Sequence, residues 1–334
     1  MKLNSVLLIL LALCNCLISC KAQPTFGTDY LKLEQVIVMP GVKGRIDHMD
    51  VNLKEKIVYI SALGNNTVEV VDIENGKLVH SIKGLDEPQG VGYIPQTNEI
   101  FIANGGNGDC YFYNAASFER MAVIHLGSDA DDVRYDSVSQ KIYVGYGDGG
   151  IAVIDAATHQ QTGNVKLPAH PEGFQSDKKA NLLLVNLPDK NMIAAIDIVQ
   201  LKLIRKWTRN TPTANFPMAV DTVHQFVFIG YRHPARLVIL NSKTGKEIAN
   251  YPMVSDVDDL YFDDATRSIY VSGGGGFINI FQPDGKESYK QIANIATSDG
   301  ARTSLLIPRL KLLVVAERAG SGKAAQLMIY NTSR

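Results

Sequence analysis

The chain has 334 residues, of which 33 are Lys or Arg and 34 are Asp or Glu, so its formal net charge is −1. This near-neutral balance lacks the basic footprint of a nucleic-acid-binding protein, and no nucleic-acid partner is expected. A chain of this length buries roughly three quarters of its extended surface, which is ample for a stable core. Only Cys110 remains after the N-terminal segment that holds the other cysteines, so no internal disulfide is expected.

The first twenty residues have the pattern of a targeting segment. Lys2 provides the positive start, and an apolar stretch over residues 6–14 is too short to span a bilayer. Residues 17–20 read Leu-Ile-Ser-Cys, which resembles a bacterial lipobox. Residues 1–19 are therefore predicted to be a lipoprotein signal peptide, with Cys20 as the lipidated first residue. The alternative is an ordinary secretory signal with an incidental cysteine, because two further cysteines lie in this segment.

Residues 20–30 are expected to form a tether between lipidated Cys20 and the folded domain. Stable anchoring takes more than one acyl chain. The predicted location is the bacterial cell envelope, either facing the periplasm or on the outer membrane. No second apolar run in the sequence is long enough for a membrane span, so the membrane contact is expected to be through the lipid anchor.

A short β-rich run recurs seven times with a period of about 42 residues. The runs lie at residues 57–60, 100–102, 142–144, 183–185, 227–229, 269–271 and 313–315. A period near 40 in an all-β pattern is typical of propeller blades, each a four-stranded sheet that cannot bury both of its faces alone. The sequence therefore predicts an all-β, seven-bladed β-propeller.

The first repeat contains four β-rich runs, whereas the last contains three. The four runs of the first repeat lie at residues 46–52, 57–62, 67–73 and 77–82, separated by polar turns. The three runs of the last repeat lie at residues 303–307, 311–316 and 325–330. The missing outer strand is assigned to residues 33–38, so that an N-terminal strand completes the last blade and removes the open sheet edges.

Two strand phrases carry a family resemblance. Residues 68–72 read Val-Glu-Val-Val-Asp and residues 151–155 read Ile-Ala-Val-Ile-Asp, each after a tyrosine-containing apolar run and a loop rich in Gly or Asn. On these motifs residues 31–334 resemble the YVTN-repeat, or YncE-like, β-propellers. The resemblance implies the fold and says little about activity, because propellers host binding, scaffolding and several enzymatic chemistries.

The loops that lead into the blades bring charged residues to the start of the innermost strands, beside the central channel. The candidates for a channel-mouth ligand or metal site are Asp47, His48, Asp131, Asp132, Glu172, Asp258, Asp259 and Arg302. Carboxylates 4 Å apart repel by about 1 kcal/mol per pair in water, and by several times more when partly buried. A divalent cation such as Ca²⁺, internal pairing with Arg302 and His48, or solvation in a wide channel would each offset that repulsion.

The loops between the second and third strands supply a second set of candidates on the same face. Arg232, His233 and Arg236 lie in one such loop, and Asp148 and Arg318 lie in two others. Two guanidinium groups suit a carboxylate or a phosphate. The alternative is a solvated loop tip.

The leading functional hypothesis is a monomeric, membrane-anchored, extracytoplasmic protein that binds a partner protein or small ligand on this charged face. No catalytic residue is predicted, and a non-enzymatic role is favoured. The rival is a calcium-dependent hydrolase similar to gluconolactonase-type propellers. In that case Asp131, Glu172 and Asp258 would supply the acids, with His48 as an acid or base.

Histidines in the same loops allow a third hypothesis, a haem-type cofactor with His48, His170 or His233 as an axial ligand. A lone loop histidine is more often solvated or hydrogen-bonded than ligated. The alternative for His170, which precedes Pro171, is that it only shapes the loop.

Overall fold

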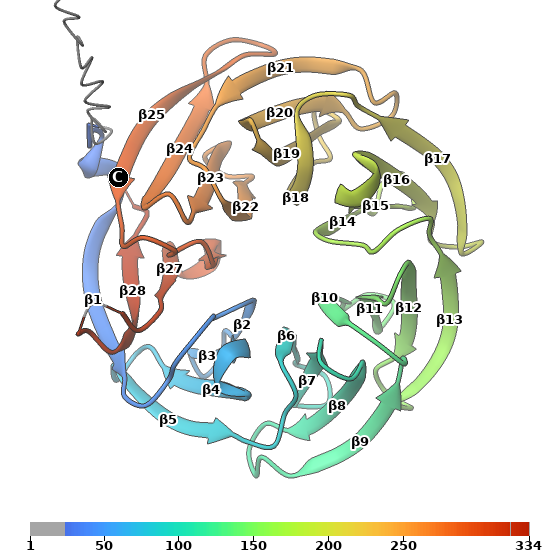
Figure 1. The fold of residues 1–334 in the computed structure, drawn as a ribbon, viewed down its shortest axis with the longest axis vertical. Helices are drawn as coiled ribbons and strands as arrows, with labels where there is room; N and C mark the ends of the chain where they lie inside the picture. Colours follow the sequence, from blue (N-terminus) through green and yellow to red (C-terminus); the bar gives the residue numbers. More distant parts are fainter. Residues whose placement is uncertain (1–23, 321, 334) are drawn as a thin grey trace, which may run out of the picture.

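Seven four-stranded antiparallel sheets form a ring in the computed structural model, which describes residues 24–320 and 322–333. Figure 1 shows the sheets arranged radially around a central channel, each with its innermost strand beside the axis. The all-β, seven-bladed propeller predicted from the repeat is confirmed. Helical structure in the described residues consists of short 3-10 turns, η1 (Thr28–Tyr30), η2 (Leu63–Asn65), η3 (Pro188–Lys190) and η4 (Pro308–Leu310).

The first six blades each use four consecutive strands, numbered outward from the channel. Blades 1 to 3 contain β2 (Met49–Asn52), β3 (Ile57–Ala62), β4 (Thr67–Asp72) and β5 (Lys77–Ile82); β6 (Pro88–Ile94), β7 (Glu99–Asn104), β8 (Asp109–Asn114) and β9 (Arg120–His125); and β10 (Ala130–Asp136), β11 (Lys141–Tyr146), β12 (Gly150–Asp155) and β13 (Gln160–Lys166). Blades 4 to 6 contain β14 (Phe174–Asp177), β15 (Leu182–Leu187), β16 (Met192–Asp197) and β17 (Lys202–Thr208); β18 (Thr213–Asp221), β19 (Phe226–His233), β20 (Ala235–Asn241) and β21 (Glu247–Pro252); and β22 (Val257–Asp263), β23 (Ser268–Gly273), β24 (Phe277–Pro283) and β25 (Tyr289–Ala296).

The seventh blade is built from both ends of the described chain. Its order outward from the channel is β26 (Ser304–Ile307), β27 (Leu312–Glu317), β28 (Ala325–Asn331) and β1 (Lys32–Met39). β1 pairs antiparallel with β28, from Lys32 opposite Asn331 to Met39 opposite Ala325. The predicted closure of the ring by an N-terminal strand is thus confirmed.

The hydrophobic core is divided among the interfaces between neighbouring blades. Seven clusters of buried apolar side chains are present, one between each adjacent pair of blades around the ring. The cluster between blades 7 and 1 includes Ile37 and Met39 of β1, which are 1% and 0% exposed. Each blade therefore needs both neighbours to bury its two faces, which explains why the repeat is stable only as a complete ring.

The predicted signal peptide over residues 1–19 and the lipidation site Cys20 lie outside the described residues. The last part of the predicted tether is described from Pro24 onward. Phe26 forms a two-way backbone bridge with Asn294 of β25, at N–O distances of 3.1 and 2.9 Å. Among residues 24–320 and 322–333, no helix is long and apolar enough to cross a membrane.

The closing strand gives a matched pair of substitutions, because neighbouring side chains of β1 point to opposite faces. Ile37→Ala empties part of the core between blades 7 and 1, so the free energy of unfolding should fall by about 2–5 kcal/mol. Val38→Thr changes a side chain that is 50% exposed. It should alter the free energy of unfolding by less than about 0.5 kcal/mol. Chemical denaturation of both variants measures the difference, and equal effects would contradict the docking of β1.

Candidate functional site

Irregularities in two inner strands place pairs of acids at the channel. The pairing of β10 with β11 shifts between Ala130 and Val133, across the two aspartates that lie between them. The pairing of β22 with β23 shifts between Val257 and Asp259. A bulge interrupts the alternation of side chains between the two faces of a sheet. Consecutive acids of β10 and of β22 can therefore both lie beside the axis.

The segment leading into blade 1 has the same two-to-one arrangement. The Asp47 N–H donates to the Ser61 carbonyl at 2.7 Å, and the Ser61 N–H donates to the His48 carbonyl at 3.0 Å. Two consecutive residues are thus opposed to one residue of β3. In blade 4 the Glu172 N–H likewise donates to the Asn186 carbonyl, at 3.0 Å. Backbone hydrogen bonds therefore hold the segments that carry Asp47, His48 and Glu172 in place.

A cavity of about 190 Å³ lies at the channel mouth and is lined by residues from all seven blades. Seven of the eight channel-mouth candidates line it: Asp47, His48, Asp131, Glu172, Asp258, Asp259 and Arg302. The eighth, Asp132, is only 1% exposed and lies outside the lining, where it accepts a hydrogen bond from the Arg134 guanidinium. Arg134 itself lines the cavity, although it was not among the candidates predicted from the sequence.

Two guanidinium groups converge on Asp258. Arg232 Nη2 lies 2.5 Å from Asp258 Oδ1, and Arg302 Nε lies 2.8 Å from Asp258 Oδ2. Arg302 also donates to Asp256 at 2.9 Å, and the Arg232 guanidinium lies 3.5 Å from the centroid of the Phe216 ring. Of the three ways to offset the acids, internal ion pairing is the one that the geometry provides at Asp258.

His48 lies among carboxylates from three blades. Its Nε2 is 3.9 Å from Asp47 Oδ1 and 3.8 Å from Asp131 Oδ1, and its Nδ1 is 3.7 Å from Asp259 Oδ1. Burial by itself would lower the pKa of His48, but the contact with Asp259 and the charges of Asp132 and Asp47 outweigh it and raise the pKa well above 6.5. His48 is therefore a cation that joins blades 1, 3 and 6.

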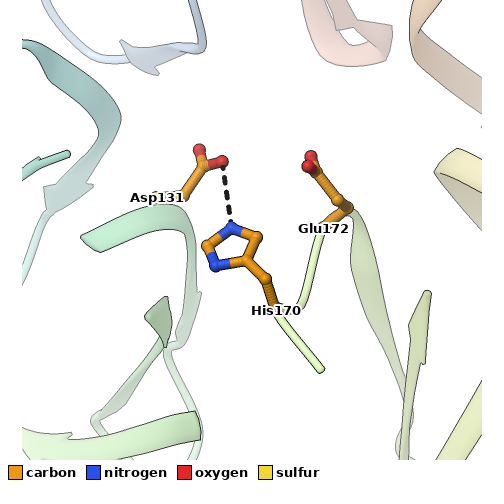
Figure 2. A group of neighbouring side chains, drawn as sticks. All are labelled: Asp131, His170 and Glu172. Atoms are coloured by element: carbon orange, nitrogen blue, oxygen red, sulfur yellow. Dashed lines mark ion pairs between the residues drawn. The ribbon is translucent and has the colours of Figure 1, made fainter. Parts of the chain in front are cut away.

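A second histidine, His170, is held beside Asp131 and Glu172 (Figure 2). Its Nδ1 lies 2.7 Å from the Gly147 carbonyl, and its Nε2 lies 3.8 Å from Asp131 Oδ2. One ligand-type atom from each of the three side chains lies within 4.8 Å of the others. The sequence signal was the phrase His-Pro-Glu. Pro171 favours an extended His170, and residues two apart in an extended segment point to the same side.

The second set of candidates does not form one site. Arg232 lies at the end of β19 and lines the channel-mouth cavity, and Arg236 on β20 donates from Nε to Asn250 at 2.8 Å. The remaining three, His233, Asp148 and Arg318, are exposed on three different blades. Arg232 thus belongs with the channel-mouth residues rather than with a solvated loop tip.

A polar layer separates the mouth cavity from the rest of the channel. His48, Arg134, Gln175, Asp259 and Tyr261 line both the mouth cavity and a second cavity of about 390 Å³ farther along the channel. The layer includes the charged side chains of Arg134 and Asp259. A ligand at the mouth would therefore meet a floor of donors and acceptors instead of an open pore.

Burial among like charges changes the acidity of the mouth residues. Removal from water is the main cause that raises the pKa of Asp47 to about 7, and the nearby carboxylates of Asp258 and Asp131 add to it. Burial likewise raises the pKa of Glu172 well above 4.5, with Asp131 as the next cause. Asp47, with a pKa near neutral pH, can therefore donate as well as accept a hydrogen bond.

The sequence matches no protein-family model and no curated protein. Among solved structures, a chain in the crystal structure of the mitotic checkpoint complex has a TM-score of 0.75 at 16% identity, over 98% of this chain and 99% of that one. A chain of Kuenenia stuttgartiensis hydrazine synthase has a TM-score of 0.73 at 14% identity, over 84% of this chain and 96% of that one. At these identities the likeness establishes the fold alone.

The raised pKa values predict that stability falls as the pH rises above about 4. In the folded protein the pKa of Asp47 is about 7 instead of 3.8, and that of His170 is about 9 instead of 6.5. Between each pair of values the folded state binds more protons than the unfolded chain, so the free energy of unfolding declines with pH. The purified protein should therefore melt at a lower temperature at pH 9 than at pH 6.

In the Asp47→Asn variant the free energy of unfolding should fall less steeply between pH 5 and 7. The difference from the wild type over this range should be a few kcal/mol at most, since one pKa unit corresponds to about 1.4 kcal/mol. Asp136→Asn is the matched control. Contact with Lys178 and two local hydrogen bonds outweigh partial burial and lower the Asp136 pKa below 3.8, so this group does not titrate in the window. An unchanged slope in Asp47→Asn would contradict the assignment.

Proposed function

We propose that this chain is a lipid-anchored β-propeller of the bacterial cell envelope, of the YVTN-repeat type, that binds a small polar ligand in the channel-mouth cavity. The observation that carries the proposal is the cavity itself, into which both acids and guanidinium groups point from around the ring. The ring supplies a rigid frame, and the bulged inner strands supply the side chains. No catalytic residue is assigned in this role.

The chemistry of the walls favours a ligand with both an anionic group and hydrogen-bond donors such as ammonium or hydroxyl. On one side, the side chains of Arg45 and Arg302 remain 47% and 20% exposed, although each pairs with an aspartate. On the other side, Asp131 and Glu172 have no guanidinium partner within 4.0 Å among the described residues. Guanidinium groups bind carboxylates in a fixed, bidentate geometry, while carboxylates accept from ammonium or hydroxyl groups.

The volume limits the ligand to a small molecule. Pockets for drug-sized ligands usually enclose roughly 300–1,000 Å³, whereas this cavity encloses about 190 Å³. A ligand in the range of an amino acid or a small hydroxy acid therefore fits better than a peptide or nucleotide. A partner protein would have to cover the mouth from outside rather than enter it.

Thermal unfolding with a panel of small amino acids, hydroxy acids and sugars tests the proposal. A ligand at 100 times its dissociation constant stabilises the folded state by about 2.7 kcal/mol, so at least one class should raise the melting temperature by several degrees. Arg302→Gln should abolish that shift, because Arg302 lines the cavity.

Arg309→Gln is the control for this experiment, since Arg309 is an exposed arginine in η4, away from the mouth cavity. It should leave the ligand-induced shift unchanged. Absence of a shift with every class would exclude a small-ligand site of useful affinity and favour a protein partner on the same face.

The cell-envelope location is a separate part of the proposal and has its own test. Cys20→Ser removes the only cysteine that could become the lipidated residue after cleavage behind residue 19. Full-length protein expressed in a bacterium should move from the membrane fraction to the soluble fraction in this variant and lose its incorporation of labelled fatty acid. Cys110→Ser, at the buried cysteine of β8, should keep both properties. Membrane retention of Cys20→Ser would contradict the anchor.

Cation-dependent hydrolysis is the second candidate function, and one observation favours it. Asp131, His170 and Glu172 place two acids and an imidazole around one point of the cavity wall. Asp258, the third acid expected for a calcium ion, instead lies between Arg232 and Arg302. Turnover of lactones or esters by the purified protein, and its loss after treatment with a chelator, would support this alternative.

A further inference from the structure

Three side chains from two neighbouring blades meet at the mouth cavity, where Asp131 and Glu172 line the wall and His170 lies beside them. Asp131 comes from the bulge of β10 in blade 3, and His170 and Glu172 come from the segment that leads into β14 of blade 4. Figure 2 shows His170 directed toward the Asp131 carboxylate and Glu172 directed toward the same space from the other side. One donor atom of each lies within 4.8 Å of the others.

A hydrogen bond to the backbone fixes the orientation of the His170 ring. Its Nδ1 lies 2.7 Å from the carbonyl oxygen of Gly147, and a carbonyl oxygen can only accept, so Nδ1 carries a proton. The Gly147 peptide is itself held, because its N–H bonds to the carbonyls of Ser128 and Asp129 at 3.1 and 3.0 Å. A backbone carbonyl on one ring nitrogen is the usual support for a histidine that binds a metal through the other. Here Nε2 is the nitrogen that faces Asp131.

The two carboxylates differ from the other acids of the cavity. Asp47 and Asp258 each contact a guanidinium group, and Asp259 accepts hydrogen bonds from the Ser304 N–H and the Tyr261 hydroxyl. In contrast, Asp131 Oδ1 is buried and makes no hydrogen bond among the described groups. An unsatisfied buried acceptor costs about 1–3 kcal/mol, and more when it is charged. The Asp131 side chain is 11% exposed, and its nearest charged neighbours, His48 and His170, stay 3.8 Å from its oxygens, so Oδ1 is an acceptor without a hydrogen-bond donor.

The spacing and the atom types indicate which cation would fit. Ligand atoms on a tetrahedral ion with bonds of about 2.1 Å lie about 3.4 Å apart. His170 Nε2 and Asp131 Oδ2 are 3.8 Å apart, and the Glu172 oxygen lies within 4.8 Å of both, so side-chain rotations would have to draw all three atoms closer around the ion. Calcium and magnesium prefer oxygen ligands alone, whereas an imidazole with two carboxylates suits zinc, manganese, cobalt and similar ions.

We propose that Asp131, His170 and Glu172 form a three-ligand site for a divalent transition-metal ion, with its remaining coordination position open to the mouth cavity. This differs from the calcium site of the rival hydrolase hypothesis in having His170 in place of Asp258 and in the class of the ion. It shares Asp131 and Glu172 with the small-ligand proposal, but the two can be tested separately, because Arg302 is not among the metal ligands. An open position is the feature that distinguishes reactive or ligand-binding metal sites from closed structural ones.

Cobalt and zinc titrations of the full-length protein, purified in detergent and freed of metal with EDTA, test the inference. The wild type should bind one equivalent of Co²⁺ with visible d–d absorbance and without a thiolate charge-transfer band, and Zn²⁺ should displace it. Millimolar Ca²⁺ or Mg²⁺ should not. Binding should release protons as the ion replaces the proton on Nε2.

Matched variants assign the ligands. His170→Gln and Asp131→Asn should each weaken Co²⁺ binding by at least about 100-fold. His233→Gln, which changes an exposed histidine of the same face, should leave it unchanged, and so should Arg302→Gln. If the Arg302→Gln variant still binds Co²⁺, the metal site is distinguished from the small-ligand site, because that substitution is expected to abolish small-ligand binding. Circular dichroism confirms that each variant is folded.

Two results would overturn the inference. One is no stoichiometric binding of Co²⁺ or Zn²⁺ by the folded wild type, which would leave the three side chains as a proton-sharing cluster. The other is equal affinity in wild type and His170→Gln, which would place the ion elsewhere.

Discussion

Repulsion between carboxylates is the constraint on which the channel of this propeller depends. The bulged inner strands bring acids from several blades to one axis, and two charges 4 Å apart interact by about 1 kcal/mol in water but about 4 kcal/mol near a protein surface. Guanidinium groups offset part of this repulsion, with Arg134 on Asp132 and both Arg232 and Arg302 on Asp258. Burial, with the nearby carboxylates adding to it, raises the pKa of Asp47 to about 7, so protonation of that group offsets more of the repulsion.

The same balance connects the site to closure of the ring. Asp258 belongs to blade 6, while its partners come from blade 5 and from the segment leading into blade 7, and His48 of blade 1 reaches acids of blades 3 and 6. None of these pairs exists in an isolated blade. The apolar clusters between blades hold the frame, and the ion pairs at its centre fix the shape of the cavity. Fold and binding chemistry are therefore properties of the complete ring.

Features that depend on local sequence patterns could be predicted from the sequence, whereas contacts between residues of different blades could not. Strands and blades depend on short apolar runs and a regular period, so the ring and its closure were predictable. The channel acids were found by aligning the repeats. The hydrogen bond between His170 and the Gly147 carbonyl was not predictable, because every residue has a backbone carbonyl and the sequence does not show which one of a neighbouring blade lies close. Arg134 was missed as a channel residue because the bulge before it changes side-chain direction in a way that strict alternation does not reveal. Arg232 was assigned to a loop, whereas β19 extends through it to His233.

The pairing of β1 with β28 has a mechanical consequence. Hydrogen bonds between antiparallel strands lie perpendicular to the strand direction, and this pair extends from Lys32 to Met39. A force that pulls the N-terminal end along β1 loads these bonds together, in shear, instead of opening them one after another. The bridge between Phe26 and Asn294 meets the load first. The strand that closes the ring is thus also placed to bear tension from whatever holds the N-terminus.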